Sequence, residues 1–209
     1  MWKEIYSRHC LLLNQLRQED FFMKTTIAAL AVILSAGSLL AGEKIEINGG
    51  FKQLDPEKTA PVGWIQNHKN KPGIGTVKIV PASEKDENAL QITTSKLHTP
   101  FYTKKAYPVK PGDTIKMKAN VKGKGSADLI VYLYDKTGVV AAEKFVRGKA
   151  VPNKFTTFKG SYTVDSTYTV KRKGETVEAV PTTVRFVFSV VPKSEIVIEN
   201  IEAEIEPAK

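Results

Sequence analysis

Two tyrosines, Tyr132 and Tyr134, stand two positions apart in a stretch where they alternate with Val131 and Leu133. Successive side chains of an extended strand point to opposite faces, so both rings are expected on one face and the aliphatic residues on the other. Two flat rings side by side form a platform on which a sugar ring could stack. The alternative is that long lysine stems or a loop cover both rings.

An arginine is expected on the same face as these tyrosines. Arg185 lies between Val184 and Phe186 in a second alternating stretch, which directs Arg185 outward if the two apolar residues point inward. A guanidinium group can hold a carboxylate or a pair of hydroxyls through two parallel hydrogen bonds. The alternative is a salt bridge from Arg185 to a neighbouring strand.

Three further candidates for ligand contact come from predicted loops and a short strand. Trp64 and Tyr102 each offer a flat face for a sugar ring, and Gln66 offers an amide beside Trp64. The alternative for Trp64 is a structural role, in which its large ring closes one end of the hydrophobic core.

A basic stripe is predicted from Lys116, Lys118 and Lys122, which alternate with apolar residues. Such a stripe would suit an acidic polysaccharide. The alternative is a solvated sheet face, on which charged side chains discourage association between sheet edges.

The stretch from Gly112 to Asp135 is the longest alternating segment, and the rest of the fold is expected to pack around it. It predicts two strands joined by a loop at Lys122–Ser126, because this loop carries the glycines that turns favour. No periodicity is evident in residues 97–112, although Phe101, Tyr102 and Tyr107 lie there.

About nine or ten strands are expected, with glycine and proline turns and no helical periodicity after residue 42. This pattern predicts an all-β, antiparallel jelly-roll β-sandwich. A hairpin with the basic tip Lys171-Arg172-Lys173 is expected within residues 166–180. A reversal of the alternation at Glu199-Asn200 predicts a β-bulge in the last strand. The first and last strands are expected to lie close together.

The N-terminal segment predicts targeting. Residues 23–41 combine Lys24, an apolar run and small residues, as in a secretory signal peptide, so we expect a secreted or periplasmic protein. Residues 1–22 are expected to be an extension from a mis-assigned start codon, the alternative being a long charged leader. The remaining domain, 42–209, has 27 basic and 19 acidic residues, a net charge of +8, and lacks the single cysteine, Cys10.

The order of several short motifs resembles carbohydrate-binding modules of the family 4/9 type. They are an Asn-Gly-Gly-Phe run, a Pro-Val-Gly-Trp run, an Asn-Ala-Leu-Gln-Ile run and a Tyr-Pro-Val-Lys-Pro-Gly-Asp run, at residues 48–51, 61–64, 88–92 and 107–113. The resemblance implies a galactose-binding-like sandwich that binds glycans on a concave face or at loop tips.

The same resemblance implies a structural calcium ion near the chain termini. Lys52 stands where the family often has an acidic residue, and Glu199-Asn200 stands where an aspartate pair is common. Calcium takes six or more oxygen ligands. We therefore expect no cofactor.

The leading hypothesis is a secreted, non-catalytic module that binds a poly- or oligosaccharide. The alternative is a structural or adhesion protein of the cell envelope that binds a protein or self-associates. An enzyme is disfavoured, because no facing carboxyl pair, nucleophilic triad or phosphate loop is evident. We expect no nucleic acid partner and no membrane insertion after signal cleavage, and the oligomeric state is left open.

Overall fold

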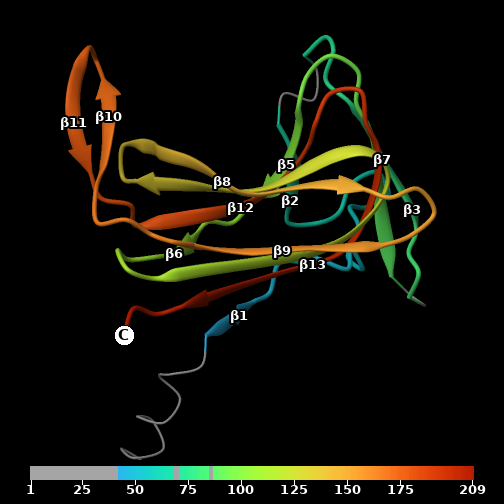
Figure 1. The fold of residues 1–209 in the computed structure, drawn as a ribbon, viewed down its shortest axis with the longest axis horizontal. Coiled ribbons are helices and arrows are strands. Elements are labelled where there is room, and N and C mark those ends of the chain that lie inside the picture. The colour runs from blue at the N-terminus through green and yellow to red at the C-terminus, as the bar shows by residue number, and fades with distance from the viewer. Residues whose placement is uncertain (1–41, 68–70, 85–86) are drawn as a thin grey trace, which may run out of the picture. The chain divides into compact units, whose positions relative to one another are not determined.

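The structure is a computed structural model, and it describes residues 42–67, 71–84 and 87–209. The predicted signal peptide and the predicted N-terminal extension lie outside these described residues. Within them the chain is all-β, with no helix that could cross a membrane. The predicted fold class, an antiparallel jelly-roll β-sandwich, is confirmed (Figure 1).

Thirteen strands occur in the described residues, more than the nine or ten expected. They are β1 (Glu43–Ile45), β2 (Trp64–Gln66), β3 (Thr76–Pro81), β4 (Asn88–Thr93), β5 (Thr99–Thr103), β6 (Tyr107–Pro108), β7 (Thr114–Asp135), β8 (Gly138–Ala150), β9 (Thr156–Thr163), β10 (Tyr168–Arg172), β11 (Glu175–Ala179), β12 (Thr183–Val190) and β13 (Glu195–Glu206). The difference in number comes mainly from short strands at the sheet margins.

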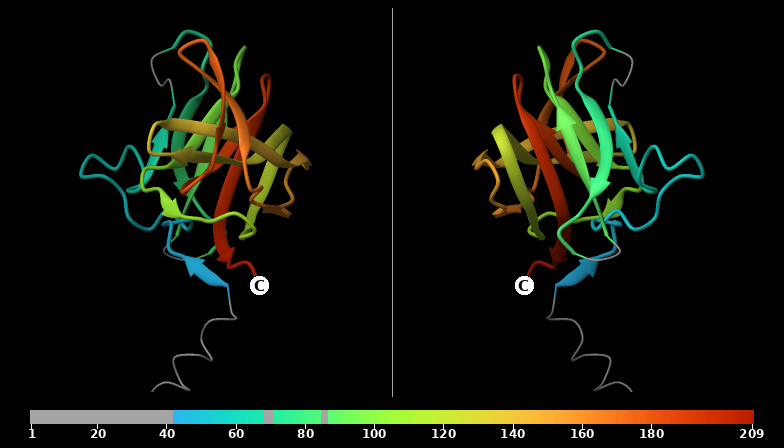
Figure 2. Two further views of the ribbon diagram at one scale, coloured as in Figure 1. Left: turned by 90° about the vertical axis from the view of Figure 1, so that its left-hand side faces the viewer. Right: turned by 90° about the vertical axis from the view of Figure 1, so that its right-hand side faces the viewer.

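The strands form two layers, which Figure 2 shows from both ends. Sheet I contains β9, the first half of β7, β13, β4 and β3, with β1 paired to β13. Sheet II contains β2, β5, β12, the second half of β7 and β8, with β6 paired to β12. All these pairs are antiparallel.

Strand β7 runs through both sheets, and this corrects the prediction of two strands with a loop between them. Its residues up to Lys124 pair with β13, and its residues from Ala127 pair with β12. Gly123 and Gly125 have φ angles of 131° and 111°, which glycine adopts without the steric cost that a Cβ imposes. The glycines therefore bend one strand from sheet I into sheet II.

The core lies between the sheets and is built by the inward positions of the alternating strands. β12 contributes Val184, Phe186, Phe188 and Val190, all with no exposed surface. β7 contributes inward residues from both of its halves, namely Ile115, Met117, Ala119, Val121, Ala127, Leu129, Val131 and Leu133. Because every inward residue has an outward neighbour, the same alternation presents a second set of side chains on each sheet's outer face.

The sequence pattern does not predict strand β5, because two of its three inward positions are polar. Thr99, Phe101 and Thr103 are buried, so two threonines hide the apolar alternation. Both hydroxyls are satisfied: Thr99 Oγ1 accepts a hydrogen bond from the Gly75 N–H (2.7 Å), and Thr103 Oγ1 accepts one from the Phe186 N–H (3.2 Å). These bonds allow threonine to occupy core positions.

Two predictions about the last strand are confirmed. The register of β13 against β7 shifts between Glu199 and Glu202, which is the predicted bulge, and Asn200 within it has a φ of 51°. The first strand, β1, pairs with β13 through Glu43 and Ile205, so the two ends of the described chain meet.

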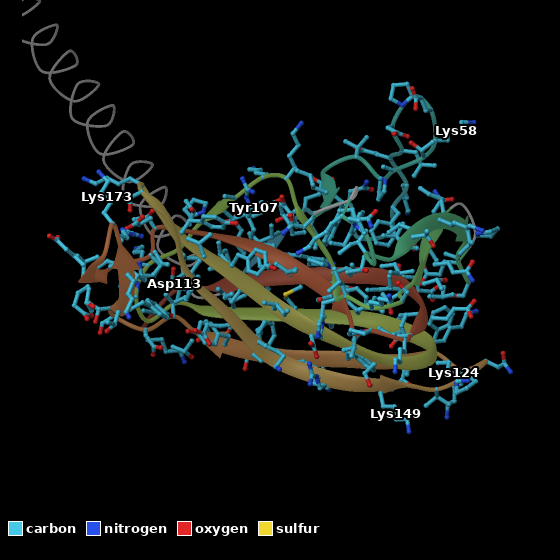
Figure 3. All side chains as sticks on the ribbon, turned by 90° about the horizontal axis from the view of Figure 1, so that it is seen from above. Lys58, Tyr107, Asp113, Lys124, Lys149 and Lys173 are labelled. Atoms are coloured by element: carbon cyan, nitrogen blue, oxygen red, sulfur yellow. The ribbon has the colours of Figure 1, made fainter. Side chains whose placement is uncertain are left out.

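The predicted hairpin with a basic tip is β10–β11, which stands out from one end of the sandwich (Figure 1). Lys173 lies at its tip, and Lys124 and Lys149 lie at the opposite end of the molecule (Figure 3). The Arg172 guanidinium fixes the hairpin by donating to both Asp135 carboxylate oxygens, at 2.7 and 3.0 Å.

Candidate functional site

Strand register brings four of the six predicted site residues onto the outer face of sheet II. Arg185 of β12 lies opposite Tyr132 of β7, and Tyr134 lies two positions further along β7. Tyr102 of β5 lies on the other side of β12, opposite Val187. Directly opposed residues of antiparallel strands share a face, so the expectation that Arg185 and the tyrosines point the same way is confirmed.

A hollow of about 320 Å³ lies over this face. Its walls are Tyr102, Tyr132 and Tyr134, with Val139 and Ala142 from β8 and Asn67 at the end of β2. The Tyr102 and Tyr132 ring centroids are 6.2 Å apart, with the ring planes at 51°. All three tyrosines are half-buried, so each ring is partly supported by the protein and partly free.

The Arg185 guanidinium lies between two of these rings. Its Cζ atom is 5.2 Å from the Tyr134 ring centroid and 5.6 Å from the Tyr102 centroid, both within cation–π range. No carboxylate of the described residues forms an ion pair with Arg185, and its Nε is buried without a hydrogen-bond partner there. The expected alternative, a salt bridge to a neighbouring strand, is therefore absent from the described part of the chain.

The hydroxyls of Tyr132 and Tyr134 remain protonated at neutral pH, because the pKa of each is raised. Burial raises the pKa of Tyr132, and the neighbouring Tyr134 and Tyr102 raise this pKa further. Burial also raises the pKa of Tyr134, although the positive charge of Arg185 acts in the opposite direction. The hydroxyls of Tyr132 and Tyr134 can thus both donate and accept a hydrogen bond.

The structure places Trp64 inside the core. Its ring is 5% exposed, stacks on Phe101 at 5.6 Å and meets the edge of Phe51 at 6.0 Å. Its Nε1–H donates to the Ile47 carbonyl at 2.7 Å. Trp64 would have to leave the core to stack on a sugar, so we leave it out of the site.

Gln66 is also engaged by the protein. Its Nε2 donates to the Gly75 carbonyl at 2.8 Å, and it follows Trp64 by two positions in β2. The alternation that directs Trp64 inward therefore directs Gln66 to the same side, away from the hollow. We leave Gln66 out of the site as well.

Asn67 is the polar wall residue that the sequence analysis missed. It lies three positions after Trp64, and its backbone N–H donates to the Pro100 carbonyl at 3.0 Å, which ties the end of β2 to β5. Once Trp64 is known to point inward, alternation places Ile65 and Asn67 on the outer side. The signal was present in the sequence, but it depended on knowing the direction of Trp64.

Two of the three lysines in the predicted basic stripe, Lys116 and Lys118, are paired with carboxylates, and Lys122 is not. Lys116 pairs with Glu206, Lys118 pairs with Glu202 at 2.9 Å, and the Lys122 ammonium lies 4.4 Å from the Phe155 ring centroid. A larger hollow, of about 710 Å³, lies over this face of sheet I, but no aromatic side chain lines it. The aromatic rings favour the smaller hollow, on sheet II, as the candidate site.

Most carboxylate oxygens at the calcium position implied by the resemblance are engaged by other residues, whereas Glu87 Oε2 is buried without a hydrogen-bond partner. Ser83 donates both its N–H and its hydroxyl to the Glu199 carboxylate, and Asn200 donates to Glu84 at 3.2 Å. Glu87 pairs with the Lys52 ammonium at 3.0 Å. No cluster of three or more acidic, histidine or cysteine side chains in the described residues is arranged for a metal.

Neither a protein-family model nor a curated protein sequence matches this chain. Solved structures match its fold. One is the CBM22-1 xylan-binding domain of Paenibacillus barcinonensis Xyn10C, with 15% identity, a TM-score of 0.54, and coverage of 81% of this chain and 99% of that domain. The tandem CBM22-1–CBM22-2 structure from the same protein has 14% identity, a TM-score of 0.54, and coverage of 81% and 48%.

A third match is the CBM22-1–GH10 part of the Clostridium thermocellum endo-1,4-beta-D-xylanase 10B, complexed with xylohexaose. It has 13% identity, a TM-score of 0.50, and coverage of 78% of this chain and 28% of that one. At these identities the similarity establishes the fold alone. The resemblance to a carbohydrate-binding-module sandwich is thus confirmed for the fold, whereas the family 4/9 assignment is not.

Proposed function

We propose that residues 42–209 form a non-catalytic module that binds a poly- or oligosaccharide on the outer face of sheet II. The observation that carries this proposal is the hollow itself, in which tyrosine rings from β5 and β7 converge with the Asn67 amide. Sugars combine apolar ring faces with hydroxyls, and this hollow combines aromatic faces with hydroxyl and amide groups. Its volume is at the lower end of the range for ligand sites, about 300–1,000 Å³.

The rigidity of the platform supports the same proposal. Tyr102 and Tyr132 are carried by strands that pair with β12 on either side, so ring spacing is set by the sheet and not by a loop. A site whose rings are already in place loses less conformational entropy when it binds. The hollow is shallow and open, so it suits a few sugar units of a longer polysaccharide chain.

The proposal includes export. The segment 23–41 has the composition of a secretory signal peptide, and polysaccharides are abundant outside the cytoplasm. The module would then act in the periplasm or outside the cell. The alternative of an adhesion protein would need a broad apolar patch, whereas the exposed large apolar residues found, Val62, Val139, Val151 and Val180, belong to separate segments.

The test is a glycan-binding screen of the chain 42–209, followed by calorimetric titration of any ligand found. Tyr132→Ala and Tyr102→Ala should each weaken binding about tenfold or more, the effect of losing a central aromatic contact. Phe155→Ala is the matched control, because it removes a half-buried ring that does not line the hollow. Equal weakening by all three variants, or no glycan ligand at all, would overturn the proposal.

A further inference from the structure

The outer face of sheet II carries more positive than negative charge, and the register shows which charges are compensated. Directly opposed outward positions contain Asp128 and Arg147, Ile130 and Lys144, and Tyr132 and Arg185. Arg147 donates to both Asp128 oxygens, at 2.7 and 2.9 Å. Arg185 and Lys144 have no carboxylate partner in the described part of the chain, so two cations on this face stay uncompensated.

On sheet I, Lys116 and Lys118 of β7 pair with Glu206 and Glu202 of β13, whereas Lys122 contacts the Phe155 ring and has no carboxylate partner among the described residues. On sheet II, Lys144 is solvent-exposed and Arg185 is half-buried against rings. A half-buried cation with no counter-ion is unfavourable, and ring faces compensate it only in part.

We propose that the outer face of sheet II is selective for acidic glycans, and that Arg185 and Lys144, which lie on this face outside the lining of the hollow, recognise the carboxylates of uronic acid residues. The inference rests on the proposed carbohydrate-binding function and names its ligand class. A ligand carboxylate would supply the counter-charge that the described residues lack. Arg185 suits this role because a guanidinium group binds a planar carboxylate through two parallel hydrogen bonds.

The spacing of the two cations favours an oligomer over a single sugar. Arg185 on β12 and Lys144 on β8 flank β7, and Lys144 is opposite Ile130 whereas Arg185 is opposite Tyr132, so their backbones are about 12 Å apart on a diagonal across the strands. A glycan lying along this diagonal would pass from one cation beside the Tyr132 ring to the other.

The experiment compares short oligomers of galacturonic acid and of mannuronic acid with the same oligomers after carboxyl reduction, each titrated against the chain 42–209. We expect the acidic form to bind about tenfold or more tightly than its reduced form. Arg185→Gln and Lys144→Gln should each weaken binding of the acidic form more than binding of the reduced form, so that the preference for the acid becomes smaller. The affinity of Arg185→Lys for the acidic oligomer should lie between the affinities of Arg185→Gln and the unaltered protein.

Lys118→Gln is the matched control, because it removes a lysine charge from the outer face of sheet I. Thermal unfolding of each variant identifies any that has lost its fold. Preferred or equal binding of the reduced oligomers would overturn the acidic selectivity and leave the carbohydrate-binding function standing. No binding of either form would overturn both proposals, and acid binding that is insensitive to Arg185 and Lys144 would overturn this site.

Discussion

At the residue scale, the aromatic side chains divide into those that stabilise the core and those that line the hollow. Trp64 contacts both Phe51 and Phe101 inside the sandwich. Tyr102 and Tyr132 contact each other on the outer face. Substitutions in the two groups should therefore have separable effects on stability and on binding.

Trp64→Ala is expected to lower the free energy of unfolding by about 3–5 kcal/mol, the range for removing a large aromatic ring from a core. Trp64→Phe should lower it by less, because a ring still stacks on Phe101, although the hydrogen bond to the Ile47 carbonyl is lost. Urea unfolding followed by circular dichroism measures both changes. A folded Trp64→Phe variant should retain glycan affinity, and loss of affinity without loss of stability would return Trp64 to the binding site.

Asp135 is expected to make folding stability depend on pH. The hydrogen bonds from Arg172 are the main cause that holds the pKa of Asp135 well below its usual value, and hydrogen bonds from Thr137 contribute. A group whose pKa is depressed in the folded state adds stability above its unfolded pKa, about 3.9, and this stability is lost as the pH falls below that value.

Asp135→Asn should therefore cost about 1 kcal/mol at pH 7, a figure that allows for solvent screening of the partly exposed pair. The difference from the unaltered protein should shrink as the pH falls from 5 to 2. Chemical unfolding at a series of pH values measures this difference. A constant difference across that range would show that Asp135 stabilises the fold without its charge.

At the element scale, the bend in β7 joins the two sheets. Gly125 lies at this bend, and a Cβ added there would come within 2.1 Å of Ser194 Oγ and 2.5 Å of Ser194 Cβ. Gly123 is similarly enclosed, by the Glu195 carbonyl oxygen at 2.1 Å. The bend thus depends on both the φ angle and the lack of a side chain.

Gly125→Ala should destabilise the protein by about 3 kcal/mol or more, because it adds a steric clash to a φ angle that alanine rarely adopts. Gly174→Ala, in the turn of the β10–β11 hairpin, is the control: its φ is 89°, and a Cβ there would meet nothing within 4 Å. This control should cost only about 1–2 kcal/mol. Thermal and urea unfolding measure the loss of stability in both variants. A similar loss for Gly125→Ala and Gly174→Ala would mean that Ser194 moves aside easily.

At the scale of the whole molecule, residues 42–47 complete the domain although they lie at one end of it. Ile45 and Ile47 are buried, and β1 pairs with β13. The Glu46 carbonyl accepts a hydrogen bond from the Tyr107 hydroxyl at 3.1 Å. The segment therefore contributes apolar burial, strand pairing and side-chain hydrogen bonds.

A chain that begins at Asn48 should be less stable than one that begins at Gly42 by about 3 kcal/mol or more, since two buried isoleucines are removed. Differential scanning calorimetry of the two chains measures the change. A variant that keeps the full length but carries Glu43→Gln, an exposed position, controls for altered charge. An unchanged melting temperature for the shorter chain would show that β1 docks only weakly.

The local pattern of the sequence by itself determined the fold class and several elements. Period-2 alternation identified the core faces of β12 and β13, the bulge at Glu199-Asn200 and the outward direction of Tyr132, Tyr134 and Arg185. These features could be predicted because side-chain direction in a strand depends only on neighbouring positions in the same strand.

Which strands become neighbours was decided by the tertiary structure alone. Strand pairing makes the expected loop at Lys122–Ser126 a bend within one strand. It also places glutamates of β13 beside Lys116 and Lys118, and it leaves Arg185 without a carboxylate partner among the described residues. It also directed Trp64 inward and joined Asn67 to the hollow. Cross-strand partners lie tens of residues apart in the chain, and no local periodicity records which residues will meet.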